Sequence, residues 1–153
     1  MSIENEAAKL IVQSYQQIDK PGVSLPTLSS EQAYDVQQKV MSLLGFSVND
    51  IRCWKVGVPN LGGPAICAPI FPDRVWTSGV SLPSRIFRDL GVELEWGYRT
   101  KRPLLLEDRP LTLATLSDAF ESPITCLEFI DSRLRVHEQH DDRAHLADNL
   151  VSA

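Results

Sequence analysis

The sequence predicts an α+β fold in which an N-terminal helical segment is followed by a part made mostly of strands. Two stretches near the start carry apolar residues at helical spacing. After Asn49 the pattern changes to short alternating runs bounded by proline and glycine, which is typical of strands. We therefore divide the chain into a helical subdomain, residues 1–50, and a second domain, residues 51–153.

The predicted elements follow from local signals. The first helix covers residues 3–18 and ends before Pro21 and Gly22. The second begins at a cap on Ser29 or Ser30 and ends at Gly45. Strands are predicted over 53–58, 91–98 and 124–130, with a helix over 112–120. Residues 68–76 hold two prolines, which indicates an edge strand or an irregular segment.

Composition excludes several classes of protein. With 43% hydrophobic residues, the 153-residue chain can form a core of its own. The net charge of -5 leaves no basic surplus for nucleic acid. The apolar runs are far shorter than the roughly 20 residues that cross a bilayer, and the acidic N-terminus is not a secretory signal. We therefore expect a cytoplasmic protein that binds neither nucleic acid nor membranes.

Three glutamates are candidate metal ligands. Glu93 and Glu95 lie two apart on a predicted strand, so both carboxylates leave the same face. Glu128 lies in an otherwise apolar strand, where a carboxylate is costly to bury without a partner. A hard divalent cation prefers such oxygen ligands and removes their mutual repulsion. The alternatives are that the first two line a solvated face and that Glu128 pairs with Arg133 or another basic residue.

The two glutamate strands belong to a series of five sequence blocks that follow one another along the chain. The blocks are, along the chain, Glu31–Gln37 (EQAYDVQ), Trp54–Asn60 (WKVGVPN), Gly91–Tyr98 (GVELEWGY), Leu127–Arg133 (LEFIDSR), and Ala147–Asn149 (ADN) followed by Ser152 and Ala153. Together they resemble the fumarylacetoacetase superfamily, and within it the 2-oxopent-4-enoate (2-hydroxypentadienoate) hydratases. The resemblance implies an N-terminal helical segment followed by part of that superfamily's mixed β-roll.

The resemblance also implies roles for individual residues. It makes Glu93, Glu95 and Glu128 the ligands of Mg²⁺ or Mn²⁺, and it makes Lys55 the active-site lysine. Asp73 matches a family acidic position loosely, and a plain turn residue after Pro72 is the alternative. A separate metal site at His137 and His140 is not expected, because their segment is very polar and corresponds to a mobile loop in the family.

The implied chemistry is the hydration of a small 2-oxo acid. The substrate's carboxylate and C2 oxygens chelate the ion, which acts as a Lewis acid on the developing enolate. The dienol becomes an unsaturated ketone, and water adds at C4 to give a 4-hydroxy-2-oxo acid. Lys55 is expected near the same oxygens, where it binds the carboxylate or moves a proton. Related decarboxylases and acylpyruvate hydrolases share the three glutamates, so they remain alternatives.

The chain departs from the family in two ways. Trp96 and Gly97 replace the usual small and aromatic residues after the second glutamate. Family members also continue well beyond the segment that ends at Ala153. We therefore expect an incomplete β-roll with open strand edges, and a homo-oligomer or a partner chain. A shortened, non-catalytic subunit that needs such a partner is the alternative to an enzyme.

Overall fold

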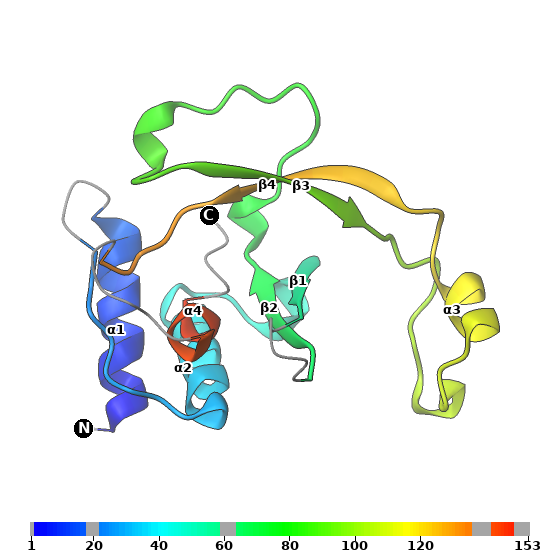
Figure 1. Ribbon diagram of the computed structural model, residues 1–153, viewed down its shortest axis with the longest axis horizontal. Helices are drawn as coiled ribbons and strands as arrows, with labels where there is room; N and C mark the ends of the chain where they lie inside the picture. The colour runs from blue at the N-terminus through cyan, green and yellow to red at the C-terminus, as the bar shows by residue number, and fades with distance from the viewer. Residues whose placement is uncertain (1, 18–21, 59–63, 136–141, 149–153) are drawn as a thin grey trace. The chain divides into compact units, whose positions relative to one another are not determined.

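The computed structural model of the chain describes residues 2–17, 22–58, 64–135 and 142–148. The chain forms two compact units: Met1–Gly91 with Phe129–Ala153, and Val92–Glu128. The elements, labelled in Figure 1, are the helices α1 (Ile3–Gln16), α2 (Ser30–Leu43), α3 (Leu113–Ala119) and α4 (Asp142–Ala147), and the strands β1 (Cys53–Gly57), β2 (Ile66–Ile70), β3 (Gly91–Gly97) and β4 (Ile124–Ile130). This mixture of helices and small sheets confirms the predicted class. The domain boundary at residue 50 stays a prediction.

Helix α1 begins at the predicted residue and ends at Gln16, slightly before the predicted end at residue 18. Helix α2 begins at the predicted cap and ends just before Gly45. Ser29 caps α2 in a reciprocal arrangement: its hydroxyl accepts from the Gln32 amide (3.2 Å), and the Gln32 side chain accepts from the Ser29 amide (2.9 Å). This satisfies donors that the first helical turn leaves free. Gly45 follows α2 with φ of 84°, a conformation that glycine adopts without strain.

The core of the first unit lies where α1, α2, α4 and β2 meet (Figure 1). The small residues Ala7, Ala8 and Ala33 are fully buried, which lets these elements approach closely. Phe71, just after β2, is the largest buried side chain. Its ring stacks on Phe46 at 5.5 Å and meets Tyr15 edge-on at 6.1 Å. The aromatic contacts therefore join both helical stretches to the end of β2.

Strands β1 and β2 form an antiparallel pair that runs from Cys53 opposite Ile70 to Gly57 opposite Ile66. This agrees with the prediction of an edge strand or an irregular segment over 68–76. Pro69 lies inside β2, where the missing amide hydrogen is tolerated because the sheet has two strands and each is an edge strand. The irregular part is the 3₁₀ turn Pro72–Arg74.

The second unit contains most of β3 and β4 and the connection that holds α3. A Cβ built on Gly91 would meet Ile130, and one built on Gly97 would meet Cys126 and Ile124, so the two paired strands run antiparallel. Thr112 caps α3 by accepting from the Thr115 amide at 3.2 Å. All of this unit is described, and Ala119 is its one buried residue.

The polar segment after Asp131 contains a helix that the sequence analysis missed. In α4, Leu146 and Ala147 are buried against the core, although the surrounding sequence is highly charged. His137 and His140 lie outside the described residues, so the prediction about them is untested. No helix in the described parts of the chain is both long and apolar enough to cross a bilayer.

Candidate metal centre

Strand β3 separates two kinds of side chain by simple alternation. Glu93 and Glu95 leave one face, and Val92, Leu94 and Trp96 leave the other. Both glutamates are exposed, and so are the apolar residues on the opposite face. The glutamate pair therefore has solvent in front of it, as a site that admits a small ligand requires.

Strand β4 brings the third carboxylate to this face. Because Gly91 lies beside Ile130 in the antiparallel pair, counting two residues along each strand places Glu128 across from Glu93. One carboxylate oxygen from each of the three glutamates lies within 4.8 Å of the other two. Glu128 is half-buried, and the other two are exposed. The structure thus brings together the three residues that the sequence singled out.

The spacing of the three oxygens fits a divalent cation. Ligand oxygens at about 2.1 Å from Mg²⁺ can be at most about 4.2 Å apart, and those at about 2.5 Å from Ca²⁺ at most about 5 Å apart. The observed limit of 4.8 Å is near these separations, so a small movement of the side chains would bring all three oxygens within bonding distance of one ion. Three carboxylates this close repel one another by about 1 kcal/mol per pair in water at 4 Å, and a cation would remove that cost.

Lys55 and Asp73 lie in the other compact unit. Lys55 is half-buried on β1 opposite Ala68, while Trp54 and Val56 point to the other face and are exposed, as the strand prediction required. Asp73 lies in the 3₁₀ turn after Pro72 with its side chain 56% exposed, and its carboxylate is 3.7 Å from Arg74 Nε. Of the two alternatives for Asp73, the structure shows the turn after Pro72. A catalytic role for either residue stays a prediction.

No protein-family model and no curated protein matches the chain. Solved structures do match it. One is 4-oxalocrotonate decarboxylase from Pseudomonas putida G7 complexed with magnesium and adipate, with a TM-score of 0.74, 20% identity, and coverage of 96% of this chain and 60% of that chain. The same enzyme complexed with calcium and acetate gives a TM-score of 0.68 and 20% identity over 94% of this chain and 60% of that chain.

The fold of the chain is therefore similar to that of this decarboxylase. The chain spans 60% of the length of the decarboxylase, and its mixture of helices and small sheets matches part of that fold. At 20% identity the likeness concerns the fold, and the roles of individual residues do not follow from it.

Within this fold, the departure at Gly97 has a physical reason. A Cβ on Gly97 would lie 2.6 Å from Cys126 Sγ, closer than real contacts allow. Gly97 shares its face with Glu93 and Glu95, and Cys126 shares its face with Glu128. The absence of a side chain at Gly97 therefore lets β3 and β4 pair closely next to the glutamates.

The structure also shows the partner of Arg133, which the sequence analysis had considered as a partner of Glu128. Arg133 and Asp148 form a buried ion pair, with Nε of the arginine 2.5 Å from the carboxylate. The Arg133 amide also donates to this carboxylate at 3.0 Å. Burial raises the pKa of the Asp148 carboxyl above its ordinary value, although the guanidinium acts in the opposite direction. The pair joins the Asp-Ser-Arg and Ala-Asp-Asn segments. Because both segments were already recognised as family blocks, they were the signal in the sequence that could have predicted this pair.

Proposed function

We propose that this chain supplies the metal centre of a hydratase, which adds water to 2-hydroxypenta-2,4-dienoate-type 2-oxo acids to give 4-hydroxy-2-oxo acids. The observation that carries the proposal is the convergence of Glu93, Glu95 and Glu128 to within 4.8 Å. The proposal includes Mg²⁺ or Mn²⁺ as the ion, a cytoplasmic location, and the two sheets as part of a mixed β-roll. Magnesium and calcium complexes of the decarboxylase with the same fold support a divalent ion.

The glutamates would hold the ion and leave part of its coordination sphere to solvent and substrate. Three monodentate carboxylates occupy half of an octahedral sphere. A bound divalent ion supplies Lewis acidity, which stabilises negative charge that develops on a 2-oxo acid. The solvent exposure of Glu93 and Glu95 leaves room for a chelating ligand of this kind.

The remaining roles rest on the family resemblance. Lys55 would bind the substrate carboxylate or move a proton, and Asp73 is a weaker candidate for acid–base work. The helix block, the lysine block and the two short blocks near the end favour a hydratase. Decarboxylases and acylpyruvate hydrolases share the glutamates, so they remain alternatives, as does a non-catalytic subunit that needs a partner chain.

The metal site is tested by thermal unfolding with and without Mg²⁺ or Mn²⁺. An ion that binds the folded chain at 100 times its Kd adds about 2.7 kcal/mol of stability, which raises the Tm by several degrees. We expect this rise in the unaltered chain and its loss in a Glu93→Gln, Glu95→Gln double variant. Glu107→Gln, which changes an exposed glutamate of the same unit, should keep the rise. An equal rise in both variants would mean that the ion binds elsewhere.

The reaction is tested by giving the chain two substrates in the presence of metal. The hydratase proposal predicts that the conjugated dienol is consumed and a 4-hydroxy-2-oxo acid accumulates. Release of carbon dioxide from 4-oxalocrotonate would instead identify a decarboxylase. Metal binding without turnover of either substrate would favour the non-catalytic alternative. A Lys55→Ala variant with unchanged turnover would remove Lys55 from the mechanism.

A further inference from the structure

The sheet formed by β3 and β4 has an apolar side that lies opposite the three glutamates. Alternation places Val92, Leu94 and Trp96 of β3 on this side. Leu127 of β4 joins them, because strand pairing puts it across from Leu94. Each of these side chains is more than half exposed, from 55% for Val92 to 73% for Leu94. We call these four residues the apolar face.

Farther along β4, the same side of the sheet is covered. The ring of Phe129, two residues after Leu127, lies 5.9 Å from the Trp76 ring and 5.7 Å from the Phe87 ring. Side chains on this side of the sheet therefore pack where the chain supplies an apolar neighbour. Within the described residues the apolar face itself has no such cover, as the exposure of its four side chains shows.

The apolar face is large for a surface that stays in water. At about 150–250 Å² for a fully exposed side chain of this size, its exposed fractions correspond to roughly 500 Å². The largest apolar patch on a typical monomer is about 300–600 Å² and often binds a partner. A stable dimer buries about 800 Å² on each side. The apolar face would therefore form the centre of such an interface, and the residues around it the rim.

A second copy of the chain fits this face in charge and in shape. The chain is acidic, with a net charge of -5, yet neither the apolar face nor the neighbouring Thr125 carries a charge. Two identical faces therefore meet without burying a charge or bringing like charges together. A twofold axis makes one surface patch its own partner, and two sheets pack through their apolar faces about 10 Å apart.

We propose that two copies of this chain pack face to face through the apolar face, about a twofold axis near Leu94. The two sheets form a small sandwich, which gives the second unit the core that it lacks alone. Because alternation turns Glu93 and Glu95 to the opposite side, both candidate metal centres lie on the outer surfaces of the dimer. The interface and the metal centre are separate, so a failure of this proposal leaves the proposed function untouched.

Size-exclusion chromatography with light scattering, run on the full chain over a range of micromolar concentrations, tests the dimer. The unaltered chain should have a mass of twice 17.1 kDa, and its Tm should rise with protein concentration. Leu94→Glu should raise the dimer Kd by about tenfold or more, because it buries an unpaired charge. Leu113→Glu, at an 86% exposed residue of α3, should leave the Kd unchanged.

Two results of this measurement would overturn the proposal. One is a monomer with a constant Tm at every concentration, which would leave the apolar face to a different polypeptide, such as the part of the decarboxylase fold that has no counterpart in this chain. The other is a mixture of larger masses, since a twofold contact closes at two copies.

Disulfide cross-linking tests the face itself and does not require Leu94→Glu to fold. Two cysteines form a disulfide only when their Cα atoms are within about 7 Å of each other. Under mild oxidation, Leu94→Cys should give a bond between two copies at position 94, which peptide mass spectrometry identifies among the bonds of the native cysteines. Leu113→Cys should give none at position 113. A dimer that cross-links at position 113 and not at position 94 would overturn the proposed face.

Discussion

The two compact units of this chain are stabilised by different means. The first buries apolar side chains of α1, α2, α4 and β2 around Phe71. The second buries Ala119 alone, and exposes 73% of Leu94 and 71% of Trp96. Its connection is organised instead by Arg102, which bonds both carboxylate oxygens of Asp108 (2.9 and 3.0 Å) and one of Asp118 (2.8 Å). Ion pairs near the surface contribute little stability, whereas apolar burial contributes much.

This difference matters because the candidate metal ligands belong to the weaker unit. A bound ion would supply several kcal/mol to a sheet that has almost no core. The exposed apolar face of β3 is the kind of surface that another polypeptide covers. The stability of the second unit is therefore expected to depend on the ion or polypeptide that binds it. The stability of the first unit is expected to depend on its own packing.

The largest expected effect comes from emptying the core of the first unit. Phe71→Ala removes the ring that stacks on Phe46 and meets Tyr15, and should lower the free energy of unfolding by about 3–5 kcal/mol. The matched control is Leu113→Ala in the second unit, whose side chain is 86% exposed, with an expected change within about 0.5 kcal/mol. Denaturant unfolding measures both. Equal losses would contradict the proposed difference between the units.

A smaller effect is expected from crowding the sheet of the second unit. Gly97→Ala places a Cβ 2.6 Å from Cys126 Sγ, which should cost about 1–3 kcal/mol and weaken the Mg²⁺-dependent rise in Tm. Adding Cys126→Ala removes the clashing sulfur, and it should restore most of the stability and most of the Mg²⁺-dependent rise in Tm. Hydrogen exchange of the β3 and β4 amides locates the change. A double variant as damaged as the single one would show that Gly97 acts by another route.

The smallest effect is the response of the Arg102 cluster to acid. Hydrogen bonds from Arg102 lower the pKa of Asp108 below its ordinary value of 3.8. The contribution of Asp108 is therefore complete above its unfolded pKa and is lost as the pH falls through the folded pKa. The Leu105 amide donates to Asp108 at 2.7 Å. Hydrogen exchange of this amide should become faster as the pH falls below about 4, by more than the pH dependence of exchange in an unfolded peptide explains. An Asp108→Asn variant that shows the same acceleration would contradict this cause.

The sequence predicted the elements whose signals are local. Ser29 and Gln32 cap α2, alternation placed Glu93 and Glu95 on one face, and Glu128 was conspicuous in an apolar strand. What brings Glu128 across from Glu93 is strand pairing, and spacing along the chain does not encode it. The family resemblance supplied that step.

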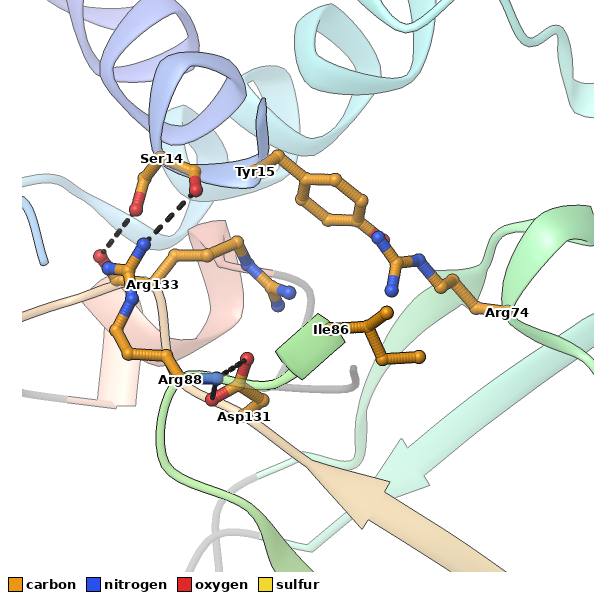
Figure 2. A pocket seen from close by; sticks show the side chains of 7 residues that line it. All are labelled: Ser14, Tyr15, Arg74, Ile86, Arg88, Asp131 and Arg133. Carbon is orange, nitrogen blue, oxygen red and sulfur yellow. Dashed lines mark hydrogen bonds between the residues drawn. The ribbon is translucent and has the colours of Figure 1, made fainter. Parts of the chain in front are cut away.

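Other features depend on contacts between residues distant in the sequence, and those were missed. Helix α4 lies in a highly charged segment, and its burial depends on Leu146 and Ala147. These two residues pack against a core whose α2 part lies more than 100 positions earlier in the sequence. The small cavity lined by Arg74, Arg88 and Arg133 (Figure 2) needs segments near residues 14, 74, 88 and 133 to converge. In neither case does a local pattern carry the information.

The first unit is assembled from both ends of the sequence, and this has a consequence during synthesis. The Gln37 side chain on α2 donates to the Leu146 carbonyl of α4 at 2.6 Å, across 109 positions. At about 5–20 residues per second, a ribosome makes the second partner about 5–20 s after the first. During that interval the surface of α2 that α4 will cover has no native partner. Nascent chains of this protein should therefore be open to chaperones and proteases until α4 emerges from the ribosome.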